Sequence, residues 1–207
     1  MLRIQNFEKR YADELIIGIG QLELPHGIYW IKGENGAGKS TLFKAIAGLI
    51  PFRGTIAFEN LDVVADPIAF RKVVNFAEAE PIYPGFLTAK DLIRFIGKAK
   101  GASEENMRSV TGHFGVDLFY DKSCETFSSG MLKKLSLTLA FLGEPKVIIL
   151  DEPLITLDEA TRHKLISLIN TFHSNGVTFL LSSHQVIERS LQLAQVFEVR
   201  QKSIHRV

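Results

Sequence analysis

The stretch Gly33-Glu34-Asn35-Gly36-Ala37-Gly38-Lys39-Ser40-Thr41 agrees at every defined position with the phosphate-binding loop pattern G-x-x-x-x-G-K-S/T. Glycines in such a loop let successive backbone N–H groups curl around phosphate oxygens, and the positive end of the following helix faces the same anion. Lys39 adds a point charge for the β- and γ-phosphates, and the Ser40 hydroxyl is placed to ligate Mg²⁺. The stretch therefore predicts that the chain binds a nucleoside triphosphate together with Mg²⁺.

The residues on either side supply the strand and the helix that this loop requires. Residues 28–31 form a short apolar run typical of a strand. Residues 41–47 carry apolar side chains at helical spacing, and Gly48 is a natural end for that helix. Short strand patterns also occur in residues 2–24 and 55–58. The first third of the chain thus predicts strands around one phosphate-binding strand–helix unit.

The composition fits one α/β domain and disfavours several classes of partner. The 207 residues, 46% of them hydrophobic, suffice for one domain, with or without a small appendage. A net charge of +1 offers no basic field for a nucleic-acid backbone, so we expect no nucleic-acid partner. Cys124 is the only cysteine, which excludes an internal disulfide, and we expect a small, partly buried side chain. No apolar run approaches the roughly 20 residues that span a bilayer, so we expect a soluble, cytoplasmic chain.

The middle third of the sequence changes to a helical period. Thr88 can cap a helix that ends at Gly101, and Ser103 opens a second helix that runs to about residue 114. Residues 128–130 then precede a third helix, which we expect to close at Gly143. These patterns predict a helical insert between two strand-bearing parts. The apolar stripes of the insert suit internal packing, although a groove beside it could hold a partner helix.

The final third alternates between strand and helix. Residues 147–150 are a continuous apolar run, typical of a strand buried on both faces, and Asp151 and Glu152 follow it at once. Open α/β sheets bind ligands at this end of a strand, so Asp151 could hold Mg²⁺ while Glu152 orients or deprotonates a water. The alternative is that the two carboxylates only cap the next turn. A helix over about residues 159–173 and a second buried strand over residues 177–181 follow, and His184 comes after that strand at the same expected edge.

Tyr11 is the one aromatic residue outside the apolar runs that we single out. It lies in the polar stretch of residues 8–13, which the sequence predicts to be a loop. An exposed ring there could stack on a nucleotide base. The alternative is a ring that packs on the edge of a sheet.

Together, these motifs resemble the ATPase subunit of the ATP-binding cassette (ABC) family over essentially the whole chain. Residues 127–131 resemble the family signature LSGGQ, Leu157-Asp158 resembles the D-loop, His184 the switch histidine and Tyr11 the adenine-stacking aromatic. The resemblance implies an α/β fold: a P-loop NTPase core with an antiparallel β subdomain and an inserted α-helical subdomain. It also implies a single ABC ATPase domain over residues 1–207, with the helical subdomain at about residues 86–142.

Two positions depart from the family pattern. The signature has Ser129 in place of its first glycine, although it retains Ser128 and Gly130, whose counterparts reach the γ-phosphate in the family. The glutamine of the family's Q-loop aligns best with Glu78, whose carboxylate could ligate Mg²⁺ but adds a negative charge beside the phosphates. Glu80 is a second candidate for this role.

The resemblance implies a mechanism in which each nucleotide is clamped between the phosphate loop of one cassette and the signature of another. We therefore expect a homodimer, or a pair with a related cassette, that closes on two MgATP and drives a separate membrane-spanning permease. The subunit would lie in the cytoplasm, peripheral on the inner face of the cell membrane. Glu152 would act as general base, His184 as γ-phosphate sensor, Asp158 at the clamped nucleotide, and Lys39 with Mg²⁺ on the transferred phosphoryl group.

Two alternatives remain open at this stage. One is a soluble ABC-type ATPase that acts on ribosomes or DNA, a class that usually carries two cassettes, coiled-coil insertions or basic arms. The other is an ATP-binding regulatory module with little turnover. Glu152 and His184 argue against the second alternative, and Glu78 leaves room for it.

Overall fold

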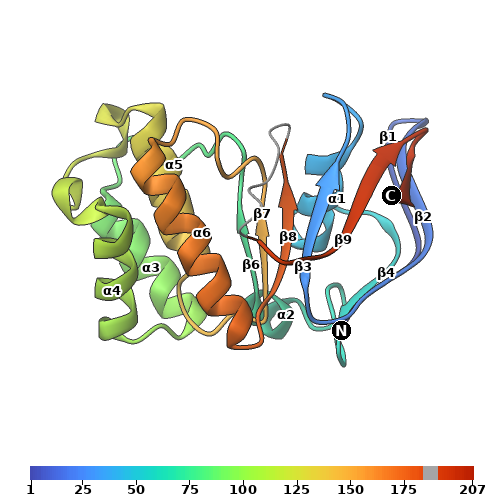
Figure 1. Ribbon diagram of the computed structural model, residues 1–207, viewed down its shortest axis with the longest axis horizontal. Helices are drawn as coiled ribbons and strands as arrows, with labels where there is room; N and C mark the ends of the chain where they lie inside the picture. Colours follow the sequence, from blue (N-terminus) through green and yellow to red (C-terminus); the bar gives the residue numbers. More distant parts are fainter. Residues whose placement is uncertain (184–190) are drawn as a thin grey trace.

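The computed structural model describes residues 1–183 and 191–207, whose strands form two sheets (Figure 1). The antiparallel sheet comprises, in spatial order, β2 (Glu14–Leu24), β1 (Leu2–Tyr11), β4 (Arg53–Phe58) and β5 (Leu61–Asp62). The second, central sheet comprises β10 (Ser203–Arg206), β9 (Leu193–Arg200), β3 (Ile28–Lys32), β8 (Thr178–Ser182), β7 (Val147–Leu150) and β6 (Val74–Ala77). Its strands run parallel from β9 to β6, and β10 is antiparallel to β9.

The parallel strands of the central sheet bring their carboxyl ends to one edge. β7 lies between β6 and β8, with Leu150 opposite both Ala77 and Leu181. β3 pairs with β8 so that Ile31 lies opposite Ser182. The residues that follow β3, β6 and β7 therefore meet Ser182 at this edge, where open α/β sheets bind their ligands.

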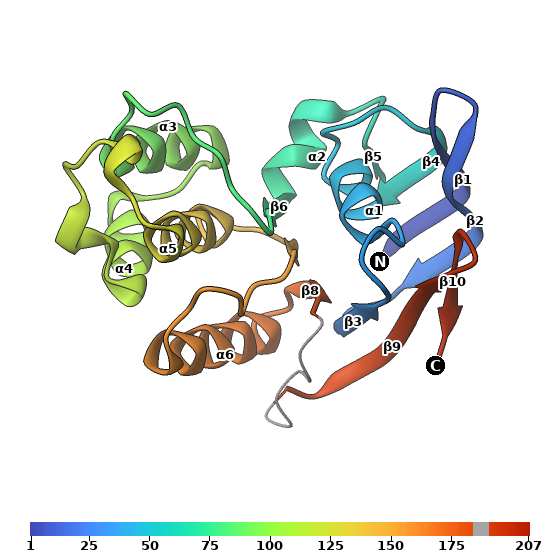
Figure 2. The ribbon, with the colours of Figure 1, turned by 90° about the horizontal axis from the view of Figure 1, so that it is seen from above.

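The central sheet separates two hydrophobic cores, because successive side chains of a strand point to opposite faces. In β7, Val147 and Ile149 join the core that contains the antiparallel sheet and α1 (Lys39–Ile46). Ile148 and Leu150 join the core formed with α5 (Ser129–Ala140) and α6 (Glu159–Ser174). Figure 2 shows α1 beside the antiparallel sheet and α6 away from it, close to α5. The prediction that residues 147–150 form a strand buried on both faces is thus confirmed.

The helices between residues 89 and 140 lie together at one end of the molecule (Figure 1). They are α3 (Ala89–Lys100), α4 (Glu104–Phe114) and α5, with short 3-10 turns η1 (Val116–Phe119) and η2 (Cys124–Thr126) between α4 and α5. The predicted caps Thr88, Ser103 and Ser128 are confirmed, since each hydroxyl accepts a hydrogen bond from the backbone N–H three residues on. None of the helices in the described parts of the chain is long and apolar enough to cross a membrane.

The prediction that residues 8–13, around Tyr11, form a loop is wrong. β1 continues through Tyr11 and turns at Ala12 into β2, with Tyr11 opposite Glu14. The strand keeps its polar residues because its end is half exposed, and the buried Lys9 donates from its ammonium to the carbonyl of Pro51 at 2.8 Å. Strand pairing in the hairpin therefore overrides the polar composition of residues 8–13.

Several other elements differ from the expectation. The third insert helix, α5, ends at Ala140, before Gly143. α2 (Pro67–Val73), β6, β9 and β10 are additional elements. In β6 the polar Asn75 interrupts the apolar pattern, yet it is 2% exposed and its amide donates to the carbonyls of Ala140 and Leu142. Cys124 fills space in the helical core, where it is more buried than the expected partly buried side chain.

Candidate phosphate-binding site

The phosphate loop, residues 33–41, connects the end of β3 to the start of α1. Gly38 is the N-cap of α1 with φ of 106°, a left-handed conformation that favours glycine, and no side chain caps the helix. At Gly33 a Cβ would lie 2.7 Å from the carbonyl oxygen of Val199, so β9 also requires a glycine here. The backbone N–H groups of the first turn of α1 consequently face the loop without a side-chain cap, as an anion site requires.

Lys39 is the cation of this loop. Its side chain is buried, and its ammonium donates hydrogen bonds to the carbonyls of Gly33 at 2.7 Å and Glu34 at 3.0 Å. Burial lowers the pKa of Lys39, while the carboxylates of Glu152 and Asp151 act in the opposite direction. Lys39 therefore stabilises the loop through two hydrogen bonds, and its positive charge interacts with the carboxylates that follow β7.

The two acidic residues that follow β7 both bond to a serine from the neighbouring strand. Asp151 and Glu152 are buried, and Ser182 Oγ donates to Asp151 Oδ1 at 2.5 Å. The backbone N–H of Glu152 donates to the same hydroxyl at 2.9 Å. Glu152 has φ of 46°, a conformation that few non-glycine residues adopt, and this hydrogen bond helps to hold it there. The sequence pattern places Ser182 at the end of a buried strand, at the expected ligand edge, but it gave this residue no role.

These residues line one cleft of about 420 Å³. Its walls are formed by loop residues 35–41, by Ala79 and Glu80 after β6, and by Asp151, Glu152 and Ile155 after β7. The structure therefore brings the predicted phosphate loop, with Ser40 and Thr41, together with both predicted acidic residues. Phosphate binding beside a pair of carboxylates is the chemistry that this cleft supports.

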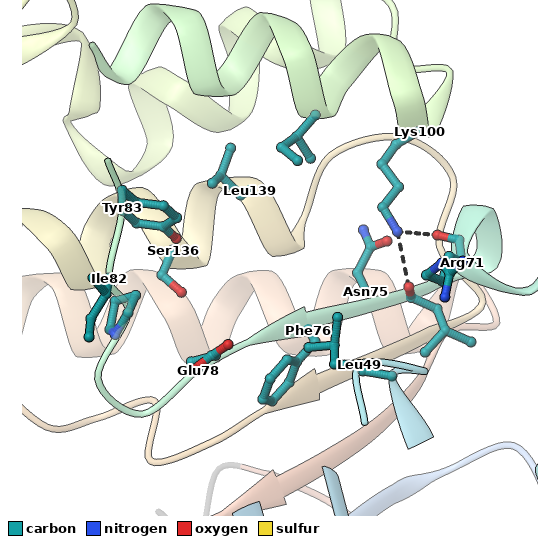
Figure 3. Close-up of a pocket in the computed structure, with 14 residues that line it drawn as sticks. Leu49, Arg71, Asn75, Phe76, Glu78, Ile82, Tyr83, Lys100, Ser136 and Leu139 are labelled. Atoms are coloured by element: carbon teal, nitrogen blue, oxygen red, sulfur yellow. Dashed lines mark hydrogen bonds between the residues drawn. The ribbon is translucent and has the colours of Figure 1, made fainter. Parts of the chain in front are cut away.

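Glu78, the first choice for the Q-loop position, lies elsewhere. Its carboxylate forms an ion pair with Lys44 at 3.1 Å and lines a separate cavity of about 270 Å³ (Figure 3). Glu80, two residues on, lines the phosphate cleft instead. The two residues follow β6 in an irregular loop, and each lines a different cavity. Glu78 is therefore not among the residues that line the phosphate cleft, and its expected role beside the phosphates stays a prediction.

The signature segment, residues 127–131, begins α5 and packs against the loop that follows Glu152. Ser128 is the N-cap of α5, and a Cβ at Gly130 would lie 3.2 Å from the carbonyl of Thr156. Asp158 is the N-cap of α6 and pairs with Lys134 on α5 at 2.9 Å. The hydrogen bond from Lys134, followed by that from the Thr161 N–H, lowers the pKa of Asp158. Ser128, Gly130 and Asp158 are not among the residues that line the phosphate cleft.

Two further predicted residues lie away from the cleft or outside the described chain. Tyr11 is 52% exposed at the end of β1, with the ammonium of Lys9 4.6 Å from its ring centroid. It is not among the residues lining the phosphate cleft or the adjacent cleft of about 540 Å³, which Ile16 and residues 34–37 and 198–202 line. His184 lies outside the described residues.

Comparison with known proteins identifies the family. Residues 21–155 match the family described as ABC transporter. The chain is 33% identical over 190 residues to the lantibiotic transport ATP-binding protein SrtF of Streptococcus pyogenes, covering 91% of this chain and 82% of that protein. It is 31% identical over 191 residues to the cytochrome c biogenesis ATP-binding export protein CcmA of Legionella pneumophila, covering 89% and 93%.

Solved structures confirm the predicted fold. An ATP-binding subunit of an ABC transporter superposes with a TM-score of 0.90 at 25% identity, over 100% of this chain and 89% of that one. The dimeric bacterial ABC transporter cassette MJ0796 superposes with a TM-score of 0.86 at 18% identity, over 100% and 97%, a likeness of fold alone. With its phosphate loop, acidic strand end and signature segment in this fold, the chain belongs to the ABC transporter family, as an ATP-binding subunit with ATPase activity.

Proposed function

We propose that two copies of this chain close on two MgATP and that hydrolysis drives a separate membrane-spanning permease. The observation that carries the proposal is the separation of the site within one copy. The phosphate cleft holds the loop and the acidic residues, whereas Ser128 and Gly130 lie outside its lining. A second copy would supply them to the nucleotide, and the dimeric cassette with the same fold supports this arrangement. A related cassette as the second partner would satisfy the same requirement.

The residues that line the cleft have the donor chemistry for Mg²⁺. The exposed Ser40 hydroxyl and the Asp151 carboxylate are oxygen ligands, and Mg²⁺ in nucleotide sites takes one or two protein ligands with phosphates and waters. When bound, the ion neutralises charge on the phosphate oxygens. Lys39 would bind the transferred phosphoryl group, and Glu152 would orient the water and accept its proton.

We assign the Q-loop role to Glu80 instead of Glu78. Glu80 lines the phosphate cleft, and Glu78 is paired with Lys44 in the neighbouring cavity. A carboxylate at this position repels a bare triphosphate and is compensated when Mg²⁺ lies between them. Glu80 would thus make ATP binding depend more steeply on the ion than a glutamine would.

The remaining roles follow from the family resemblance and from exposure. The exposed ring of Tyr11 would stack on adenine, and Asp158 would contribute beside the signature of the opposite copy. His184 would sense the γ-phosphate. Each of these assignments is carried by the sequence motif, because Tyr11 and Asp158 do not line the described cleft and His184 lies outside the described residues.

The membrane partner would dock on the side of the subunit that carries exposed apolar residues. Ile82 is 91% exposed and Leu49 is 53% exposed, and both lie along the cavity beside Glu78 (Figure 3). Exposed apolar side chains around a cavity are typical of protein interaction sites. In the cell we place the subunit in the cytoplasm, peripheral on the inner face of the membrane that holds the permease.

Glu152→Gln tests the dimer and the hydrolytic role together. The amide keeps the shape of the side chain but removes its basicity, so hydrolysis should fall at least about a hundredfold, within the range of a lost general base. Size-exclusion chromatography with MgATP should then show the dimer accumulating, and the same variant without ATP is the control. A variant that binds ATP and stays monomeric would overturn the clamp. Low turnover in the wild type would favour the regulatory alternative, and failure to co-purify with membranes would favour a soluble ATPase.

Glu80→Gln and Glu78→Gln separate the two Q-loop candidates. We expect Glu80→Gln to bind metal-free ATP about tenfold more tightly, which corresponds to roughly 1.4 kcal/mol of removed repulsion. Glu78→Gln is the matched control and should bind metal-free ATP like the wild type. Titration of ATP with and without Mg²⁺ measures both. A shift confined to Glu78→Gln would return the role to Glu78.

A further inference from the structure

Lys133 is a buried lysine whose ammonium ties together two parts of the chain at the phosphate cleft. It projects from α5 and is 1% exposed. Its Nζ donates to the carbonyls of Glu78 at 2.9 Å, Ala79 at 3.1 Å and Asp151 at 2.9 Å. These three bonds use all three N–H donors of the ammonium. The side chain is therefore fully engaged by backbone oxygens that come from two different strand ends.

The backbone that Lys133 holds forms one wall of the phosphate cleft. The β6–β7 ladder ends with Ala77 opposite Leu150, and the N–H of Asp151 donates to the carbonyl of Ala77 at 2.9 Å. Beyond this point, Lys133 joins the two segments by bonding to residues 78 and 79 on one side and to Asp151 on the other. Glu80 comes directly after the held carbonyls. The lysine thereby fixes the direction from which Glu80 enters the cleft.

Burying the charged ammonium of Lys133 costs free energy, because the group loses its hydration. Desolvation lowers the pKa of Lys133 to about 8, and the carboxylates of Asp151, Glu152 and Glu80 oppose that change. Well-packed apolar side chains often stabilise a core at least as well as a buried charge does. The three hydrogen bonds of Lys133 to carbonyls at the cleft wall point to a role in orienting that part of the backbone, in addition to any contribution to stability.

The same helix begins at the signature segment, because Ser128 caps α5 five residues before Lys133. We propose that Lys133 is a positioning residue that couples α5 to the Glu80 and Asp151 wall of the cleft in its own copy. This inference rests on the proposed function, in which the start of α5 contacts the nucleotide of the second copy. In the dimer, the start of α5 in one copy would lie at the nucleotide bound by the second copy. A shift of α5 at that nucleotide would be transmitted through Lys133 to the acidic wall of the cleft in the first copy.

Lys100 offers a matched control. It lies at the end of α3, and its ammonium donates to the carbonyl of Val74 at 3.0 Å and to that of Arg71 (Figure 3). It therefore joins the same helical part to α2 and to the start of β6. Its bonds are at the start of β6, whereas Lys133 binds residues just beyond the end of β6 at the cleft. Lys100 is partly buried, and its loss removes a lysine–carbonyl link of the same kind without touching the wall of the cleft.

The first experiment compares steady-state ATPase kinetics of Lys133→Met, Lys133→Arg and Lys100→Met in the full chain. We expect Lys133→Met to lose about tenfold or more in kcat with KM for ATP within about threefold, because orientation and not binding is lost. Lys133→Arg should recover part of kcat, since it restores a charged donor. Lys100→Met should lower the melting temperature to a similar extent and keep kcat within about twofold. Equal kcat losses in Lys133→Met and Lys100→Met, or unchanged kcat in Lys133→Met, would overturn the proposal.

A double-mutant cycle with Glu80→Gln tests the coupling itself. If Lys133 directs Glu80 into the cleft, Glu80→Gln should tighten metal-free ATP binding in the wild-type background and have a smaller effect in Lys133→Met. The same effect in both backgrounds overturns the role of Lys133. No effect in the wild-type background instead overturns the assignment of Glu80. If Lys133→Met does not yield folded protein, Lys133→Gln takes its place in both experiments with the same expectations.

Discussion

Ser182→Ala should weaken both the fold and the chemistry, because one hydroxyl serves both acidic residues. Ser182 Oγ donates to the Asp151 carboxylate at 2.5 Å and accepts from the Glu152 N–H at 2.9 Å, and Ser182 is 0% exposed. A hydrogen bond to a charged group contributes about 1.5–3 kcal/mol, and a buried N–H left without a partner costs about 1–3 kcal/mol. The side chain loses one atom, so little apolar contact changes. We therefore expect the free energy of unfolding to fall by about 3 kcal/mol.

Urea unfolding followed by circular dichroism measures this loss. With a slope of about 2 kcal/mol per molar urea, a loss of about 3 kcal/mol lowers the midpoint by about 1.5 M. Ser109→Ala, on the exposed face of α4, is the control and should change stability by less than about 0.5 kcal/mol. Equal midpoints for the two variants would refute the bridging role of the Ser182 hydroxyl.

The same substitution should also lower kcat. Glu152 adopts its left-handed conformation with φ of 46° while its N–H is held by Ser182. Without that bond the carboxylate can move away from the attacking water, and small misplacements of a catalytic group cost about tenfold to a hundredfold in rate. Phosphate release under saturating MgATP measures kcat. The assay is run without urea, at a temperature well below that at which the variant unfolds. A variant that is destabilised but keeps the wild-type kcat would limit Ser182 to a structural role.

Two further predictions concern Lys39 and Lys100. Lys39→Ala should weaken MgATP binding at least about tenfold, measured by calorimetry, because it removes a charge worth at least about 1.4 kcal/mol to the phosphates; near-normal affinity would contradict the phosphate-loop assignment. Burial lowers the pKa of Lys100 from 10.5 to about 8, so between these values the unfolded chain binds a proton that the folded chain has released. The free energy of unfolding should therefore rise more with pH over this window in the wild type than in Lys100→Met, and parallel urea-midpoint profiles would contradict it.

The features that the sequence predicted well depend on residues only a few positions apart. The cap of α3 is complete within four residues, since Thr88 accepts from the Asp91 N–H and Asp91 accepts from the Thr88 N–H. The phosphate loop needs nine consecutive residues, and β7 needs four apolar ones. Local chemistry of this kind is visible in one sequence, and the fold class followed from the order of such motifs.

The elements that the sequence missed are held by contacts between distant residues. β6 contains Asn75, whose amide binds carbonyls 65 and 67 residues away, so its polarity gave no sign of burial. The end of β1 keeps Lys9 buried through the carbonyl of Pro51, 42 residues away. Similarly, alignment alone could not show that Glu78 and Glu80 line different cavities, because the irregular loop after β6 decides where each residue lies.

The polar residues that hold the acidic residues of the cleft wall in place are also distant from them in the sequence. Ser182 reaches Asp151 across 31 residues, and Lys133 reaches it across 18. A reading based on hydrophobic periodicity assigns a lysine in a helix to the solvent, yet Lys133 faces inward because three carbonyls satisfy its ammonium. The carboxylates that a motif identifies therefore depend, for their position, on partners that no motif includes. In this subunit those partners are Ser182 on β8 and Lys133 on α5, so substitutions of these two residues should act on the chemistry without touching the nucleotide.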